Sequence, residues 1–195
     1  MPSSILALFE ETGAYLRGHF RLTSGLHSGE YLQCAKVLAY PRHAEQLGQA
    51  LAQKLRPLLE GATVTVVSAP AIGGLIIGHE VARAFDVPFL FSERDSTTNE
   101  MTVRRGFSFQ PNDRAVVVED VVTTGGSTRE VIQLLQQAGV EVLAAGSIID
   151  RSNGSANVGV PRVALAQMEV LAYEPANCPL CLQGLPLVKP GSKRV

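Results

Sequence analysis

The segment from Arg114 to Arg129, Arg-Ala-Val-Val-Val-Glu-Asp-Val-Val-Thr-Thr-Gly-Gly-Ser-Thr-Arg, constrains the fold more than any other part of the chain. It begins with a short β-branched apolar run over 115–118, which is typical of a buried strand. Two acids follow, and then a small, polar, glycine-rich loop over 123–128. From Glu130 the spacing predicts a helix that ends at Gly139. The order strand, acidic pair, glycine loop and helix is that of a βα unit.

The acidic pair and the glycine loop suit a phosphorylated sugar. A glycine-rich loop at a helix N-terminus offers backbone N–H groups and the positive end of the helix dipole to a phosphate. The carboxylates of Glu119 and Asp120 can accept hydrogen bonds from two neighbouring hydroxyls, as on a ribose, or hold a divalent cation directly or through water. The chain has no Gly-Lys pair and no G-x-G-x-x-G, so the common nucleotide-binding patterns are absent.

Composition argues against several classes of protein. The chain has 195 residues, of which 46% are hydrophobic, and this predicts one domain with a small appendage. With a net charge of −1, a pI of about 6.4 and no run of Lys or Arg, we expect no nucleic acid as the main partner. No apolar run approaches ~20 residues, so we expect no membrane partner. Three cysteines and an N-terminus without a charged start predict a cytoplasmic location.

Segments of strand and helix character alternate along the rest of the chain. The expected elements, in order, are a helix from Ile5 that ends near Gly13, two short strands within 14–33, a helix over 41–60 whose regular part Pro57 should end or kink, a strand over 63–68, a helix over 75–85, a strand over 87–91, a strand over 142–149 and a strand-like segment over 158–168. In the helix over 75–85, we expect four apolar side chains to face inwards: Ile76, Ile77, Val81 and Phe85. The alternation predicts right-handed βαβ units and a parallel sheet, and hence an α/β fold.

Two further loops are expected near the acidic pair. In parallel sheets, ligands lie beyond the carboxyl ends of the strands, so the loop over 69–74 should face the same crevice as Glu119 and Asp120. A close-packed turn explains the glycines of this loop equally well. The segment 92–110 is the longest without clear periodicity, and such loops are often lids or disordered. A solvated β-hairpin is the alternative, and one segment can be both.

The segment from Val116 to Thr128 resembles the phosphoribosyl diphosphate (PRPP) motif of type I phosphoribosyltransferases, where two acids and two apolar residues join a strand to a Thr/Gly-rich loop. An ordinary βα turn is the alternative. Residues 20–25 (Phe-Arg-Leu-Thr-Ser-Gly) and 28–31 (Ser-Gly-Glu-Tyr) are similar to the N-terminal hood of the orotate branch of that family. Residues 149–151, Ile-Asp-Arg, resemble the orotate-binding sequence. From the residues alone, a surface ion pair within 149–151 explains that sequence as well.

The resemblance implies a fold and a reaction. The fold is that of type I phosphoribosyltransferases, a central parallel sheet flanked by helices with a small hood. We expect the hood at about 1–40 together with 155–195, and the core at about 41–154, within one phosphoribosyltransferase domain. The implied reaction joins PRPP and orotate to give orotidine 5′-phosphate and diphosphate, with Mg²⁺, in de novo pyrimidine synthesis. The resemblance also implies a homodimer.

The resemblance implies roles for individual residues as well. The implied catalytic residues are Asp120, Glu119 and Arg94. The implied PRPP-binding residues are Glu119, Asp120, Val121, Val122, Thr123, Thr124, Gly125, Gly126, Ser127, Arg94 and Gly73. The implied orotate-binding residues are Thr123 and Arg151. Mg²⁺ is expected to bind mainly through PRPP, and Asp120 is the candidate for a contact through water.

The chain departs from the family pattern in its cations. Many members carry a Lys and His cluster in the lid, whereas here Arg94 is the counterpart of its leading basic residue and only Arg104 and Arg105 follow. Thr23 and Gly73 stand where two further lysines are common. Arginine can replace lysine as a phosphate clamp, but it cannot donate a proton at neutral pH. The sequence therefore leaves open which lid residues act.

Two other functions stay open on the sequence. One is a purine-base phosphoribosyltransferase, and the other is a PRPP-sensing regulator that binds nucleic acid with weak or no catalysis, which the altered lid favours and the near-neutral charge opposes.

One cysteine motif remains outside the PRPP interpretation. Cys178-Pro-Leu-Cys181 is half a zinc site, but the sequence shows no other ligands, so a simple turn is favoured. The four histidines, His19, His27, His43 and His79, show no metal spacing, and we expect them to be packing or surface residues.

Overall fold

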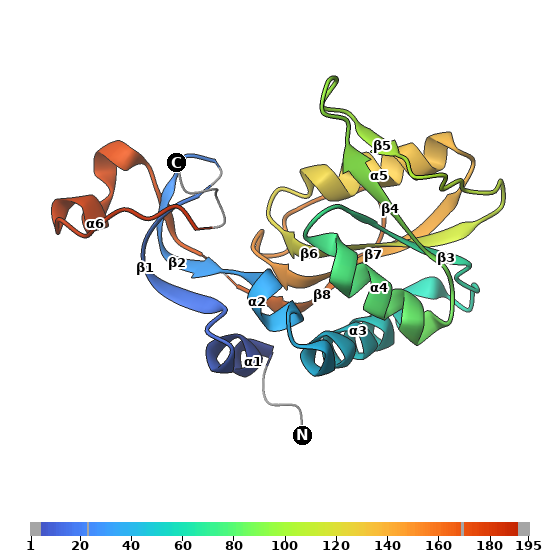
Figure 1. Cartoon of the computed structure of the whole chain (residues 1–195), viewed down its shortest axis with the longest axis horizontal. Helices are drawn as coiled ribbons and strands as arrows, with labels where there is room; N and C mark the ends of the chain where they lie inside the picture. The colour runs from blue at the N-terminus through green and yellow to red at the C-terminus, as the bar shows by residue number, and fades with distance from the viewer. Residues whose placement is uncertain (1–4, 23, 169, 191–195) are drawn as a thin grey trace. The chain divides into compact units, whose positions relative to one another are not determined.

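The computed structural model describes residues 5–22, 24–168 and 170–190, and Figure 1 shows its elements. The chain forms two compact units. The larger unit covers Leu38–Met168, and the smaller unit combines Met1–Val37 with Glu169–Val195. The second boundary falls at Met168 rather than near the expected residue 155, because strand β8 (Arg162–Gln167) pairs with β7 in the large sheet.

The larger unit is built on a six-stranded sheet with the order β5-β4-β3-β6-β7-β8. The strands are β3 (Val66–Pro70), β4 (Phe89–Arg94), β5 (Met101–Val103), β6 (Arg114–Val122), β7 (Glu141–Asp150) and β8. All pairs are parallel except β4 with β5, which is antiparallel. The sheet confirms the predicted α/β class with a mainly parallel sheet.

Helices cover both faces of this sheet (Figure 1). They are α3 (Pro41–Leu55), α4 (Gly74–Phe85) and α5 (Gly126–Gln137). Helix α3 lies against β7, since a Cβ on Gly146 would lie 3.1 Å from the side chains of Leu51 and Leu55. Helix α5 packs on the other face, against Ala145 and Val117. Regular α-helix ends at Leu55, and a 3₁₀ turn at Arg56–Leu59 continues it, as expected from Pro57.

The core between α5 and the sheet explains why α5 forms. Val131, Ile132 and Leu135 of α5 are at most 2% exposed and pack on β3, β6 and β7. Burying each such side chain contributes about 1.5–3 kcal/mol. On α4, the expected inward side chains Ile77 and Val81 are buried, but Ile76 is 44% exposed. Ile76 is one residue before Ile77, and successive residues of a helix are rotated by about 100°, so Ile76 points away from the buried face that contains Ile77 and Val81.

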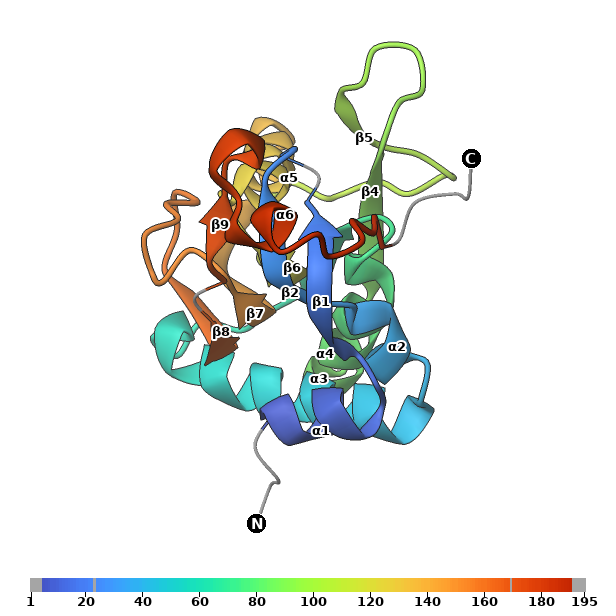
Figure 2. The same cartoon turned by 90° about the vertical axis from the view of Figure 1, so that its left-hand side faces the viewer.

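The smaller unit contains a three-stranded antiparallel sheet with the order β1-β2-β9, which Figure 2 shows side by side. Its elements are α1 (Ile5–Glu11), β1 (Tyr15–Arg21), β2 (His27–Leu32), β9 (Ala172–Tyr173), the 3₁₀ turn Pro175–Asn177 and α6 (Pro179–Leu182). A short helix, α2 (Cys34–Leu38), ends at the boundary between the units and was not expected. The predicted pair of strands within 14–33 is confirmed.

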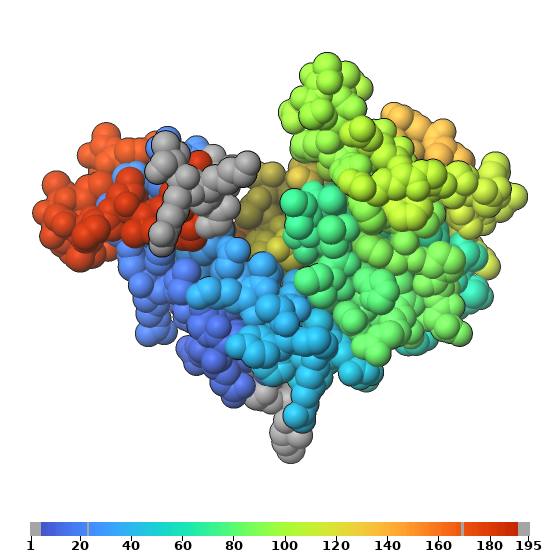
Figure 3. Space-filling model, viewed as in Figure 1, coloured from blue at the N-terminus to red at the C-terminus, as the bar shows by residue number. Residues whose placement is uncertain are grey.

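The segment 92–110 forms the hairpin that the sequence offered as an alternative. Strands β4 and β5 pair antiparallel, with Ser92 opposite Val103 and Arg94 opposite Met101. In Figure 3 the hairpin tip projects from the surface of the larger unit. Among the described residues, no helix combines the length and apolar character that crossing a membrane requires.

Candidate active site

Three strand ends meet at the carboxyl edge of the large sheet. Strand β3 ends at Pro70, β6 at Val122 and β7 at Asp150, and β6 lies between the other two. Each strand is followed by a loop. Because the strands are parallel, these three loops share one edge of the sheet, which is where ligands bind in open α/β folds.

Glu119 and Asp120 lie inside β6, not after it as the sequence suggested. Strand pairing with β7 continues past them, with Glu119 opposite Ser147 and Val122 opposite Asp150. The loop is correspondingly shorter, because α5 already begins at Gly126.

The loop after β3 approaches the acidic pair closely. A Cβ added to Gly73 would lie 2.6 Å from Oδ1 of Asp120 and 2.8 Å from Oδ2. The φ angle of Gly73 is −57°, which any residue adopts, so its lack of a side chain serves the close approach and not the backbone conformation. The predicted juxtaposition of the 69–74 loop with the acids is therefore present.

Glu119 is an unusual acid because it is only 8% exposed. Burial, reinforced by the neighbouring charge of Asp120, raises the pKa of Glu119 well above its ordinary value. Its Oε1 accepts a hydrogen bond from the Asp120 backbone N–H over 3.2 Å, while Oδ1 of Asp120 accepts one from the Val121 N–H over 2.8 Å. Hydroxyl donors or a cation at this position would favour the ionised form of Glu119.

The turn into α5 requires glycine at position 125. Gly125 has a φ of +76°, and a Cβ there would lie 2.8 Å from Cγ1 of Val158. Thr124 Oγ1 accepts a weak hydrogen bond from the Gly126 N–H at 3.4 Å, and no side chain of the N-cap residue caps the helix. The first turn of α5 therefore keeps N–H groups and the positive dipole end available for an anion.

Arg151 lies beside the loop that begins at Thr123. Its backbone N–H donates to the Val122 carbonyl over 2.8 Å, which extends the pairing of β6 with β7 by one step. The two residues that the resemblance assigned to orotate, Thr123 and Arg151, are thus the first residues beyond two paired strands. The structure brings them together at the sheet edge.

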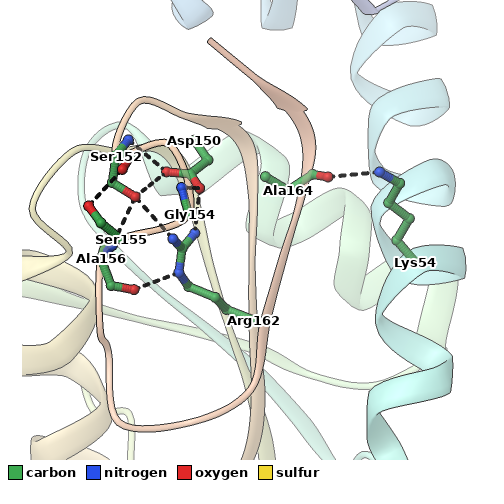
Figure 4. Close-up of polar contacts among 8 residues, drawn as sticks. All are labelled: Lys54, Asp150, Ser152, Gly154, Ser155, Ala156, Arg162 and Ala164. Carbon is green, nitrogen blue, oxygen red and sulfur yellow. Dashed lines mark hydrogen bonds and ion pairs between the residues drawn. The ribbon is translucent and has the colours of Figure 1, made fainter. Parts of the chain in front are cut away.

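Asp150 does not form the surface pair with Arg151 that the sequence left open. Its side chain is fully buried and pairs with Arg162 of β8, whose Nη1 donates to Oδ2 over 3.0 Å (Figure 4). The Ser152 hydroxyl and backbone N–H donate to Oδ1 over 2.6 and 2.8 Å, and the Gly154 N–H donates to Oδ2 over 3.0 Å. Burial alone would raise the pKa of Asp150, but the hydrogen bonds from Ser152 and Arg162 lower it overall.

The Asp150 network fixes the loop that carries Arg151. Arg162 also donates to the Ala156 carbonyl over 2.8 Å and to the Ser152 hydroxyl over 3.0 Å (Figure 4). Asp150 and Arg162 therefore act as positioning residues, a role that sequence reasoning missed. The Asp-x-Ser-x-Gly spacing after a strand is the available signal, because Asp often bonds backbone groups two to four residues ahead.

The arginines of the β4–β5 hairpin rest against acids of the larger unit. Arg94 Nη2 lies 2.7 Å from Oε2 of Glu130 on α5, and its Nη1 donates to the Asn99 carbonyl over 2.8 Å. Arg105 Nη2 donates to Glu93 Oε2 over 2.9 Å, and Arg104 Nη1 lies 3.6 Å from an Asp95 oxygen. The structure thus places Arg94 beside α5. Thr23 lies outside the described residues.

The chemical groups at this edge of the sheet suit a phosphorylated sugar. Backbone N–H groups at the start of α5 are available to an anion, two carboxylates offer acceptors for a diol, and the backbone of Arg151 lies at the same sheet edge. Groups in this arrangement favour a group transfer at the sugar, because they hold both reactants in place and neutralise charge.

Comparison with known proteins identifies the family. Residues 36–159 match the family described as phosphoribosyl transferase domain. The chain belongs to this family.

Its relatives define the branch. The chain is 50% identical over 191 residues to the orotate phosphoribosyltransferase of Pelotomaculum thermopropionicum, covering 98% of this chain and 97% of the relative. It is 51% identical over 187 residues to that of Carboxydothermus hydrogenoformans, covering 96% of each. The crystal structure of the Aeropyrum pernix orotate phosphoribosyltransferase superposes with a TM-score of 0.69 at 27% identity, over 85% of this chain and 94% of that chain. The chain is a member of the orotate phosphoribosyltransferase family, as the resemblance predicted.

Proposed function

We propose that the protein transfers the phosphoribosyl group from PRPP to orotate, giving orotidine 5′-phosphate and diphosphate in de novo pyrimidine synthesis. The observation that carries the proposal is the meeting of the acidic pair, the Gly73 loop and the Gly125 turn at one sheet edge. Full-length relatives that are named orotate phosphoribosyltransferases support orotate over a purine base as the acceptor.

The proposed binding of PRPP follows from the groups at this edge. The N–H groups over 123–127 hold the 5′-phosphate, and the carboxylates of Glu119 and Asp120 accept hydrogen bonds from the two ribose hydroxyls. Breaking the bond at C1 of the ribose leaves positive charge on the sugar ring, and the two carboxylates lie where they can stabilise it. Because Gly73 has no side chain, the diphosphate can approach the backbone of the 69–74 loop closely.

The residues present fit Mg²⁺, because carboxylate oxygens are the donors that this ion prefers. The half-buried Asp120 is the proposed protein contact, through a water molecule, and PRPP supplies most of the ligands. When bound, the ion neutralises the charge of the departing diphosphate.

Arg151 is the proposed orotate contact. Its planar guanidinium can bind a carboxylate through two hydrogen bonds, and the Asp150 network fixes the backbone on either side of it. Orotate is already an anion, so the reaction requires positioning more than base catalysis.

The hairpin arginines are the proposed lid cations, acting in a cytoplasmic homodimer. Arg94 is the first candidate to meet the diphosphate, with Arg104 and Arg105 as further candidates. In the structure each arginine is already paired with an acid or a carbonyl, so closure over a diphosphate exchanges those partners.

The decisive experiment follows the ultraviolet absorbance of orotate after addition of PRPP and Mg²⁺, with diphosphate release measured in parallel. We expect orotate loss at a rate equal to diphosphate release, and neither without PRPP. Adenine, guanine and hypoxanthine in place of orotate should release no diphosphate. Turnover with a purine but not with orotate would overturn the proposal, and salt-dependent binding of nucleic acid without any turnover would favour the regulator.

A further inference from the structure

The smaller unit gathers four metal-ligand atoms that lie far apart in the sequence. They belong to His19, His27, Cys178 and Cys181, and all lie within 4.8 Å of one another. His19 Nε2 is 3.1 Å from His27 Nδ1, 3.5 Å from Cys178 Sγ and 3.7 Å from Cys181 Sγ. Cys181 Sγ is 3.3 Å from His27 Nδ1. The expectation that these histidines merely pack, and that the cysteines form a simple turn, overlooked this convergence.

We propose that these four residues bind a structural Zn²⁺ ion. Zinc bonds nitrogen at about 2.0–2.1 Å and thiolate sulfur at about 2.3 Å, usually in a tetrahedron. Such a tetrahedron has edges of about 3.3–3.8 Å between its ligand atoms. Four of the six separations are 3.1 to 3.7 Å, close to this range, and all six are within 4.8 Å, so shifts of the side chains alone can complete the tetrahedron.

The backbone presents the ligands in two pairs. Cys178 precedes α6 and Cys181 lies within it, so one turn of chain places both thiols together. On the hairpin, His27 pairs with Arg21, and His19 lies in the irregular part of β1 between Arg17 and Phe20, where the register with β2 shifts. The rings of His19 and His27 meet edge to face, with centroids 4.9 Å apart.

The surroundings of the ligands are those of a closed site. His19, His27 and Cys178 are 3%, 6% and 1% exposed, and Cys181 is exposed, which leaves an entry path for the ion. His19 Nδ1 lies 2.8 Å from the Leu185 carbonyl. The ring must donate there, because a carbonyl only accepts, so neutral His19 presents the lone pair of Nε2 to the cluster.

Over the described residues 170–190, hydrogen bonds at Leu171 and Val188 and the short pairing of β9 join the C-terminal segment to the β1–β2 hairpin. Strand β9 pairs with β2 at only two positions, and α6 has no buried residue. Large apolar side chains of the segment are exposed: Leu171, Leu182, Leu185, Leu187 and Val188. A metal that joins this segment to the β1–β2 hairpin supplies stability that a small core cannot. Two histidines and two thiolates in a tetrahedron select zinc among the common metals, and four protein ligands leave no open position for catalysis.

The test measures metal in the full-length protein, purified without chelators and without a histidine tag. We expect inductively coupled plasma mass spectrometry to find about one zinc ion per chain. The double variant Cys178→Ser/Cys181→Ser should lose more than nine-tenths of this zinc, and His19→Ala most of it. Cys34→Ala and His79→Ala change the same residue types outside the cluster and should keep the wild-type content.

A second measurement covers the case in which the ligand variants fail to fold. Zinc is removed from wild-type protein under reducing conditions and replaced with Co²⁺. Tetrahedral cobalt with two thiolates should give visible d–d bands and thiolate-to-metal charge transfer in the near ultraviolet. A wild-type protein without zinc and without these cobalt bands would overturn the proposal, as would a disulfide between Cys178 and Cys181 in the purified protein. Neither readout uses a substrate, so the result is independent of the proposed reaction.

Discussion

The β6–α5 junction and the four-residue cluster of the smaller unit are two sites of opposite construction. At the junction, two acids, the glycine turn and the helix N-terminus follow one another within a single βα unit. In the cluster, Cys178 and Cys181 meet histidines that lie 154 to 162 positions earlier in the chain. The first is a local arrangement that the chain order itself displays. The second exists only after a hairpin and the C-terminal segment have come together.

The two sites should therefore fail in different ways when altered. The acids at the junction are the proposed ligand contacts, and their loss should change turnover with little effect on folding. The proposed metal ligands hold the smaller unit together, and their loss should change stability first.

The largest expected effect is that of Asp120→Asn on turnover. The variant keeps the shape of the side chain but loses the charge that we propose faces the ribose and Mg²⁺, so kcat should fall about 100- to 1,000-fold. The melting temperature and the zinc content should stay at the wild-type values. Asp86→Asn, at the exposed end of α4, is the matched control and should keep full activity. Near-wild-type turnover of Asp120→Asn would remove the acid from the mechanism.

Removal of the proposed zinc should affect stability next. Chelation of wild-type protein should lower the melting temperature by about 5–10 °C, because the ion stabilises the folded smaller unit and not the unfolded chain. The Cys178→Ser/Cys181→Ser variant should already melt at the lower temperature and should not respond to chelator. A chelator response in that variant equal to that of the wild type would place the relevant metal elsewhere.

A smaller effect is expected from Gly125→Ala. The positive φ costs an L-residue about 1–2 kcal/mol, and the new methyl group also meets Val158 at 2.8 Å, so the free energy of unfolding should fall by about 2–4 kcal/mol. Gly61→Ala has a similar φ of +84° with no atom within 4 Å of the new Cβ, and it should cost about 1–2 kcal/mol. Urea titrations of both variants measure the difference. Equal losses would show that contact with Val158 does not matter.

Glu119→Gln should give the mildest change in stability, and this change should depend on pH. The folded-state pKa of Glu119 lies above the ordinary value of 4.5, so protonated Glu119 favours folding and that contribution is lost as the pH rises through the raised pKa. Glutamine does not titrate, so the variant should gain stability relative to wild type as the pH rises from the ordinary value of 4.5 through the raised pKa. Urea midpoints across this range measure it. A constant difference between the two proteins would mean that Glu119 is not perturbed.

Most of the fold could be predicted from the sequence, and so could the parts of each site that are close together in the chain. The strand and helix order, the PRPP-like segment, the Pro57 break in α3 and the Gly73 loop could be predicted, because each depends on neighbours in the chain. The extent of β6 could not, since pairing with β7 decides where it ends. The same holds for Asp150, whose partner Arg162 comes from the next strand.

The sequence did not show that His19 and His27 belong to the proposed metal cluster, because their partners Cys178 and Cys181 are distant in the chain. Ligand spacing in sequence is informative only within one turn or hairpin, and His19 and His27 flank a hairpin whose pairing the sequence did not fix in register. A C-x-x-C motif together with two histidines on one face of a predicted hairpin is the signal to search for. The diphosphate contact of Arg94 stays a prediction.

The bond between Asp150 and Arg162 has a consequence for synthesis on the ribosome. Arg162 belongs to β8, the last strand of the large sheet to emerge, so a nascent chain that ends before it holds a buried carboxylate without its cation. Such a charge is costly, and the loop that presents Arg151 stays unlocked until β8 docks. We therefore expect chains that end before β8 to bind the proposed substrates less well than the whole larger unit does.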